Sequence, residues 1–216
     1  EKKYSTLDEY VARMKDGQDK IFYACGETVE KIDMLPQTDA VLDKGYEILY
    51  LTEYVDEFCL KMLGEYEGKQ FQNICDEKLD LDTEEEKKAL GEKNEQNKEM
   101  LEFISDALGE AVSGAAFTNK LKNHPVCLMS DGNLSLEMEK VLNSMPNAGE
   151  NKVKADISLE INASHPIAEK LIGLYESDRE MLKKYAKLLY AQGCLISGVS
   201  IKDPAELCEL IVDLMV

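Results

Sequence analysis

The sequence contains no tryptophan and only two histidines, His124 and His165. A catalytic thiol usually needs a nearby histidine, so this scarcity leaves little material for a cysteine nucleophile. The glycine-rich signatures of dinucleotide and P-loop sites are absent, as are the zinc-protease motif H-E-x-x-H and the nucleophile motif G-x-S-x-G. We therefore expect this stretch of chain to contain no catalytic residue and no metal site.

Positive charge is also in short supply, with 25 Lys and Arg against 43 Asp and Glu and a formal net charge of −18. Such a surplus repels nucleic-acid phosphate and anionic lipid, so we expect neither a nucleic-acid partner nor a membrane partner. No apolar run approaches the roughly 20 residues that a membrane-spanning helix needs. The hydrophobic fraction of 44% and the charged fraction of 31% are typical of a soluble globular protein.

The cysteines are dispersed and contain no C-x-x-C pair, which argues against a secreted disulfide framework. We interpret each of them as a small buried hydrophobic residue and expect a reducing, cytoplasmic location. The six are Cys25, Cys59, Cys75, Cys127, Cys194 and Cys208. The chain begins at Glu1 with a helix signal under way by Thr6, so we expect it to be a piece of a longer protein.

The first third of the chain alternates helix and strand signals. Thr6 and Glu9 have the spacing of a capping box at a helix start. Short apolar runs at 21–25, 48–51 and 69–75 predict strands, and amphipathic segments at 28–35, 38–44 and 55–66 predict the helices between them. Strands separated by helices favour right-handed crossovers and parallel pairing. We predict a small three-layer α/β domain over residues 1–78.

A dense acidic run over residues 76–88 interrupts this alternation and marks the predicted boundary to a second domain, residues 79–216. Its Asp-x-Asp start resembles a calcium loop, but the position that requires glycine is Glu85, so we reject that motif. An acidic first turn is instead typical of a helix start, and we predict one long helix over 84–110.

The second domain is predicted to be mixed α+β, with a small sheet and a C-terminal helical bundle. Strands at 113–118 and 125–129 are expected to pair, a helix spans 134–145, and a loop spans 146–151. The alternating segment 157–161 predicts a half-buried strand. Three helices close the chain, beginning after His165, at a capping box on Ser177, and at Asp203-Pro204.

Two apolar groups in this second domain could be core or binding surface. Five residues share one face of the predicted helix 134–145, and the pattern alone favours core, although methionine suits a surface that accepts varied partners. They are Leu134, Met138, Val141, Leu142 and Met145. The last two helices are also apolar on one face. They either pack on their own domain or pair with a second copy to form four helices, and the pattern leaves both open.

One further segment could bind a small molecule. The junction Cys25-Gly26-Glu27-Thr28 joins a predicted strand to a helix, where backbone N–H groups can hold an anion. A single glycine is weak evidence, and Glu27 has the wrong charge beside a phosphate. A turn is the favoured interpretation, and a small-molecule or phosphate-binding regulatory α/β domain is the alternative function.

Several segments resemble the heat shock protein 90 chaperones of the bacterial HtpG type. The most specific is residues 4–15, YSTLDEYVARMK, supported by GYEILYLT at 45–52, VDEF at 55–58 and GKQF at 68–71. Further along, LEIN at 159–162 with His165-Pro166 is similar to the C-terminal domain of the family. The resemblance spans essentially the whole chain and implies the distal middle region joined to the dimerization domain.

The resemblance implies a non-enzymatic part of an ATP-driven chaperone. The nucleotide-binding domain and the arginine that completes the ATPase would lie upstream, so ATP and magnesium belong to the full-length parent and no cofactor is expected here. The missing acidic tail of eukaryotic cytosolic members favours a bacterial source. The implied partners are unfolded or partly folded client proteins and a second copy of the chain.

The resemblance also assigns residues to these two roles. Client binding falls to Phe58, where bacterial relatives often carry Trp, and to Leu134, Met138, Val141 and Leu142. Homodimerization falls to the last two helices, within residues 178–216. The dimerization residues are Met181, Leu182, Tyr185, Leu188, Leu189, Leu207, Leu210, Ile211 and Leu214.

Overall fold

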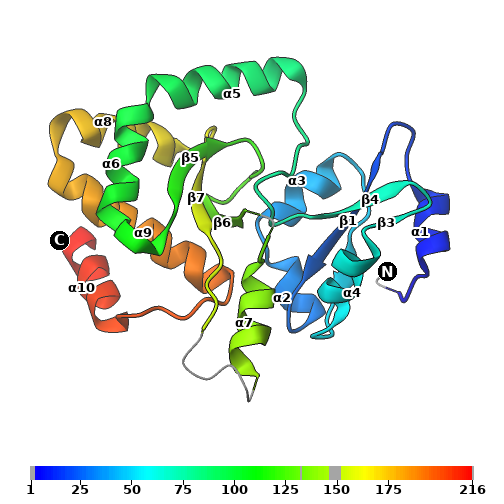
Figure 1. The fold of residues 1–216 in the computed structure, drawn as a ribbon. Helices are drawn as coiled ribbons and strands as arrows, with labels where there is room; N and C mark the ends of the chain where they lie inside the picture. The colour runs from blue at the N-terminus through cyan, green and yellow to red at the C-terminus, as the bar shows by residue number, and fades with distance from the viewer. Residues whose placement is uncertain (1–2, 132, 146–151, 216) are drawn as a thin grey trace.

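The computed structural model describes residues 3–131, 133–145 and 152–215. Figure 1 shows two groups of elements side by side, one from the first third of the chain and one from the remainder. Each group has its own sheet, and helices make up much of the rest. The mixed α+β architecture predicted from the sequence is confirmed.

The first unit is built on a four-stranded sheet in the order β2-β1-β4-β3. Strand β1 is parallel to β2 and to β4, as the crossover argument predicted. The elements are α1 (Leu7–Arg13), β1 (Lys20–Cys25), α2 (Val29–Asp33), α3 (Gln37–Asp43), β2 (Leu49–Leu51), α4 (Asp56–Leu63), β3 (Glu65–Tyr66) and β4 (Lys69–Asn73). The short strand β3 was not predicted. It pairs antiparallel with β4 through a tight turn in which Glu67 and Gly68 both have positive φ.

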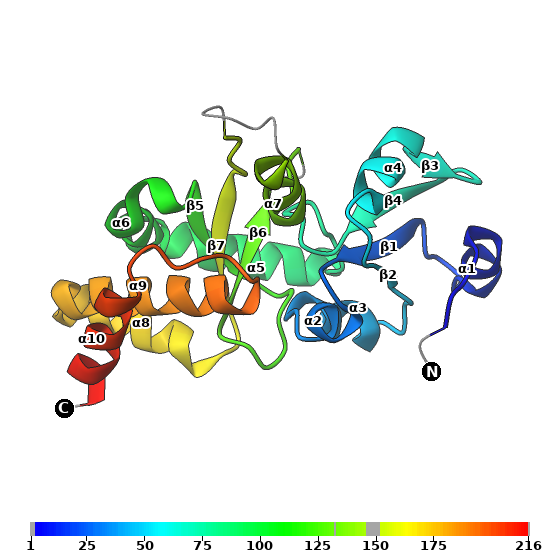
Figure 2. The same cartoon turned by 90° about the horizontal axis from the view of Figure 1, so that it is seen from below.

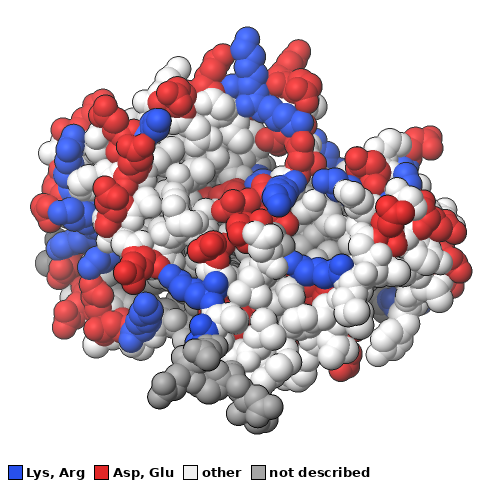
Figure 3. Space-filling view, viewed as in Figure 1, with Lys and Arg blue, Asp and Glu red and all other residues white. Residues whose placement is uncertain are grey.

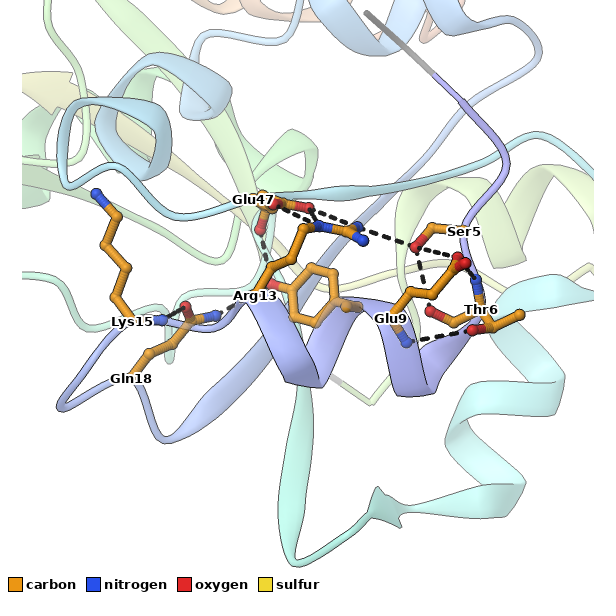
Figure 4. Close-up of polar contacts among 8 residues, drawn as sticks. Ser5, Thr6, Glu9, Arg13, Lys15, Gln18 and Glu47 are labelled. Atoms are coloured by element: carbon orange, nitrogen blue, oxygen red, sulfur yellow. Dashed lines mark hydrogen bonds and ion pairs between the residues drawn. The ribbon is translucent and has the colours of Figure 1, made fainter.

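Helix α1 begins with the predicted capping box and is fastened to the sheet by its polar groups. The Thr6 hydroxyl accepts from the Glu9 N–H, and the Glu9 carboxylate accepts from the Thr6 N–H. Tyr10 is buried and donates its hydroxyl to the Glu47 carbonyl at 2.7 Å, while burial raises its pKa. Arg13 forms a two-pronged ion pair with the Glu47 carboxylate (Figure 4). These contacts hold α1 against the segment that enters β2.

The second unit is built on a three-stranded sheet in the order β5-β7-β6. Strand β7 is central, parallel to β5 and antiparallel to β6. The elements are α5 (Glu84–Gln96), α6 (Lys98–Leu108), a 3₁₀ turn (Gly109–Ala111), β5 (Gly114–Thr118), β6 (Val126–Ser130), α7 (Leu136–Ser144), β7 (Ile157–Asn162), α8 (Pro166–Ser177), α9 (Arg179–Ile196) and α10 (Pro204–Met215). Helices α6, α8 and α9 pack against this sheet, as the turned view shows (Figure 2).

The prediction of one long helix over 84–110 is wrong, because the helix is interrupted at Asn97. That residue leaves helical geometry, with φ −111° and ψ 16°, and its side-chain amide donates to the Lys93 carbonyl at 2.8 Å. Helices α5 and α6 consequently run in different directions (Figure 1). The side chain thereby satisfies a carbonyl at the end of α5, and the apolar face of α6 can turn onto the sheet.

Three further expectations for the second unit are corrected. The strands predicted at 113–118 and 125–129 do not pair with each other, because β7 lies between them. Strand β7 is buried along its whole length rather than half-buried. The last-but-one helix is capped by Asp178, which accepts from the Met181 N–H at 3.0 Å, whereas Ser177 donates to the Gly173 carbonyl within α8. The loop predicted at 146–151 lies outside the described residues.

Strand β6 contributes to two apolar cores. Val126 and Leu128 face the core formed with helices α6, α8 and α9. Cys127 and Met129 point to the opposite face, because successive side chains of a strand alternate. There they pack with residues of the first unit: Phe22, Ala24, Ile32, Val41 and Ile74. The polar face of β7 is covered by the segment between β5 and β6, where Lys120 pairs with Glu160 at 3.0 Å and the Asn162 amide donates to the His124 carbonyl at 2.9 Å.

Polar contacts cross the same junction. The buried Gln37 amide donates to the Leu128 carbonyl at 3.1 Å, the Glu77 N–H donates to the Ser130 carbonyl at 2.8 Å, and the Ser130 N–H donates to the Cys75 carbonyl at 2.9 Å. The acidic run enters α5 through the capping box of Thr83 and Glu86. The division of the chain at residue 78 into two domains stays a prediction.

Candidate functional site

Side chains assigned to client binding by the resemblance meet at the junction of the two units. Phe58 of α4 lines a small crevice, of about 30 Å³, together with Met138 and Val141 of α7. The turn at Cys25-Gly26-Glu27 and Tyr54 complete its wall. The fold thus brings together residues that lie far apart in the sequence.

The predicted client-binding residues are not a fully open stripe. Met138 is 9% exposed, and Phe58, Leu134, Val141 and Leu142 are half-buried. Leu134 packs against the core of the second unit. Only part of the predicted face is therefore accessible in this conformation, and Met138 is buried where it lines the crevice.

A more open apolar surface surrounds the crevice and was not predicted. Tyr54 and Val55 are 73% and 62% exposed, and Met62 at the end of α4 is 89% exposed. Figure 3 shows that the region over α2, α4 and α7, at its lower right, carries few charged atoms, whereas acidic and basic side chains crowd the left side. The spacing of Val55, Phe58 and Met62 along one helical face was the available signal.

A buried carboxylate lies at the wall of this crevice. Glu57 is 4% exposed and accepts from the Asn73 amide at 2.8 Å, from the Tyr23 hydroxyl at 3.3 Å, and from the Ser135 hydroxyl. Ser135 is the N-cap of α7, and its oxygen accepts from the Met138 N–H at 3.1 Å. Nothing in the sequence marks Glu57, because an acid in a first helical turn is ordinary.

Thiols and a phenol near Glu57 are held in their neutral forms. Burial, and then the charge of Glu57, raises the pKa of Tyr23 and of Cys25, and the same causes raise the pKa of Cys75 to about 12. These cysteines are therefore protonated at neutral pH and poor nucleophiles. The interpretation of every cysteine as buried is wrong for Cys59 and Cys208, which are exposed.

Helix α10 is the second candidate surface. Although most of its residues are apolar, none of those described is buried. Ile211, Val212 and Met215 are 37%, 57% and 79% exposed. Two ion pairs hold α10 to α9, Lys184 with Asp213 at 2.8 Å and Lys187 with Glu206 at 2.6 Å. Such exposed pairs contribute little to the stability of the contact between α10 and α9.

A hollow beneath α10 explains why its inner residues stay accessible. A cavity of about 520 Å³ lies between α9, α10 and the segment that joins them. Leu207 and Leu210 line it, together with Tyr190, Cys194 and Ile201. Both leucines are consequently half-buried rather than packed into a core.

Some residues assigned to dimerization face inward instead. Leu182 and Leu189 are 0% and 5% exposed and belong to the core of their own chain, because they lie on the side of α9 that covers the sheet. Met181 and Tyr185 are partly buried against the same core. The outer side of α9 presents Leu188, half-buried, with other predicted residues supplied by α10: Leu207, Leu210, Ile211 and Leu214.

The turn at Gly26 has a structural explanation. Its N–H donates to the Leu51 carbonyl at 3.1 Å, and a Cβ there would lie 2.9 Å from Ile32. The helix that follows is only five residues long. His165 is the N-cap of α8, where its Nδ1 accepts from the Ile167 N–H at 3.1 Å, in agreement with a local structural role.

Two other kinds of site have no candidate in the part of the chain that the structure describes. Among residues 3–131, 133–145 and 152–215, no group of His, Cys, Asp and Glu side chains is placed to hold a metal ion. In the same described ranges, no helix has the length and apolar character needed to cross a bilayer.

Comparison with known proteins places the chain in a family. The family model described as Hsp90 protein matches residues 1–216. Chaperone protein HtpG of Natranaerobius thermophilus is 47% identical over 206 residues, and those of Clostridium acetobutylicum and Bacillus subtilis are 46% and 44% identical over 215 and 216 residues. The matches cover 95% to 100% of this chain but 32% to 34% of each relative, so the chain spans about a third of their length. The chain belongs to the heat shock protein 90 family, as its resemblance to the bacterial HtpG type indicated.

Proposed function

We propose that this stretch serves a chaperone by self-association through α10 and by binding non-native protein at the surface around Phe58. The similarity to HtpG chaperones supports a chaperone role. The observation that carries the proposal is that α10 is mainly apolar while none of its described residues is buried. Apolar surface of this kind marks an interaction site.

A second copy of the chain is the proposed partner of α10. In a two-fold dimer each α10 meets the same surface of its partner, so an exposed apolar helix can cover itself. Together with the outer side of α9, two copies supply four helices around a shared apolar centre. Ile211, Val212 and Met215 would form the centre of this contact, since they are the most exposed apolar residues of α10.

Non-native segments of other proteins are the proposed partners of the surface around Phe58. Phe58, Met138 and Val141 line its crevice, Leu142 continues the face of α7, and Tyr54, Val55 and Met62 form the open rim. Methionine is flexible and adapts to partners of varied shape, which suits recognition of many unfolded sequences.

Two variants of the same chemistry separate these roles. Met215→Ser is expected to weaken self-association in sedimentation equilibrium and to leave binding to a reduced, alkylated model protein unchanged in fluorescence anisotropy. Met62→Ser, its matched control at the other surface, is expected to do the reverse. A wild-type chain that stays monomeric at high concentration would overturn the dimer proposal, and no binding of the unfolded protein would overturn the client proposal.

ATP hydrolysis and the binding of ATP and magnesium are proposed to belong to the rest of the parent protein, which we place in the cytoplasm. Isothermal calorimetry of this chain with magnesium ATP, and with inorganic phosphate, is expected to show no heat of binding. Saturable heat would favour the alternative of a regulatory phosphate-binding domain.

A further inference from the structure

The surroundings of Glu57 consist of donors. The carboxylate is 4% exposed, and the Tyr23 hydroxyl, the Asn73 amide and the Ser135 hydroxyl all point their hydrogens at it. An ionised carboxylate only accepts, so it satisfies all three at once. A glutamine of the same shape would turn an NH₂ group toward one of these donors. That NH₂ group would point at Ser135, whose hydroxyl would then accept instead of donate.

Ser135 connects this carboxylate to the start of α7. Its hydroxyl donates to Glu57 across a sequence separation of 78 residues, and its oxygen accepts from the Met138 N–H at 3.1 Å. The residue after Glu57 is Phe58, and both Phe58 and Met138 line the crevice. Two hydrogen bonds in series thus join the two helices that carry the crevice walls.

The bond between Glu57 and Ser135 lies between two spaces. On one side is the crevice of about 30 Å³, and on the other is a polar cavity of about 460 Å³ that both residues line. Close packing is therefore interrupted at this part of the junction. The alignment of α4 and α7 depends correspondingly more on directional polar contacts. Lys61 of α4, which donates to the Asn133 carbonyl at 3.1 Å, is the neighbouring contact.

We propose that Glu57 and Ser135 are positioning residues, which fix the first turn of α7 against α4 so that Phe58 and Met138 face each other. The consequence for clients rests on the proposed function, whereas the alignment of the helices does not. Neither residue needs to touch a client. The link makes the shape of the crevice depend on both units of the chain.

A matched pair of variants tests the link without removing the helix cap. Asn and Asp are both good N-caps, and the adjacent cavity has room for either. Ser135→Asn can still donate to Glu57, whereas Ser135→Asp places a second carboxylate against it. We expect amide hydrogen exchange at residues 138–142 of Ser135→Asp to be about tenfold faster than in Ser135→Asn, with exchange at Leu159 of the core as the internal reference.

A reciprocal exchange provides the decisive arm. Glu57→Gln combined with Ser135→Asp should slow exchange in α7 relative to Ser135→Asp alone, because the Gln amide can donate to the new carboxylate. Thr83→Ala, which removes the cap of α5, should leave α7 unchanged. The proposal would be overturned if amide exchange in α7 were equally fast in Ser135→Asn and Ser135→Asp. It would also be overturned if exchange in the double variant were no slower than in Ser135→Asp alone. Client affinity is measured separately. If the wild-type chain does not bind the unfolded protein, the proposed function is refuted and the proposal about helix alignment is not affected.

Discussion

Leu182 lies on the side of helix α9 that packs into the core of its own chain. Its side chain is 0% exposed and lies in the core of the second unit. Leu182→Ala removes three carbon groups at about 0.8 kcal/mol each and leaves a cavity, so we expect a loss of about 3–4 kcal/mol in the free energy of unfolding. For a chain of this length, each kcal/mol corresponds to about 2–4 °C in Tm.

The assay is urea unfolding followed by circular dichroism, repeated over a range of protein concentrations. Because Leu182 packs inside its own chain, its cost should be the same at all concentrations. Leu195→Ala, on the same helix at 62% exposure, is the control and should change the free energy by less than about 0.5 kcal/mol in the monomer. The reasoning is refuted if Leu182→Ala costs under about 1 kcal/mol, or if its cost appears only at concentrations where the chain self-associates.

Three other variants probe features of the junction and of α10. Lys120→Met leaves the buried Glu160 carboxylate without its cation, which lies 3.0 Å away, and should cost about 3–5 kcal/mol by urea unfolding. A cost near zero would mean that Glu160 finds another partner. Gln37→Ala removes the donor to the Leu128 carbonyl and should cost about 1–3 kcal/mol in the same assay; an unchanged midpoint would count against that bond. Asp203→Ala removes the cap of α10 and should accelerate amide exchange at Glu206, with a cost of about 0.5–2 kcal/mol to the helix.

Local signals allowed most of the elements to be predicted. The capping box at Thr6, the apolar runs that became β1 and β2, and the Asp203-Pro204 helix start all depend on neighbours within a few residues. The strand order of the second sheet could not be predicted in this way. Strand β7 inserts between two strands that precede it in the sequence, and the pairing depends on contacts far along the chain.

Burial was harder to predict than secondary structure. The alternation in β7 is typical of a strand with one exposed face, but the segment between β5 and β6 covers that face, where Lys120 forms an ion pair with Glu160. The apolar pattern of α9 and α10 likewise did not show which leucines face inward. The apolar face of a helix can be wider than the surface it buries, so Leu182 and Ile211 look alike in sequence but are 0% and 37% exposed.

The candidate site was predicted only where apolar residues define it. The resemblance supplied Phe58, Met138 and Val141, and the fold brings these three to one crevice. Glu57 and Ser135 were not predicted, because their role depends on their burial at the junction of the two units. A charged or hydroxylated residue at a helix start is ordinary by itself, and only the three-dimensional contacts show that the two residues bond to each other.

The placement of β6 in two cores has a consequence for how the chain unfolds. A strand that loses its partners on one face also loses the support for the other, so Cys127 and Met129 cannot separate from the first unit without disturbing Val126 and Leu128. Amide exchange should therefore report a common opening free energy for β1 and β7, although they belong to different sheets. We expect a cut at the sequence boundary near residue 78 to remove from the first unit Leu121, Cys127 and Met129, which complete its interior.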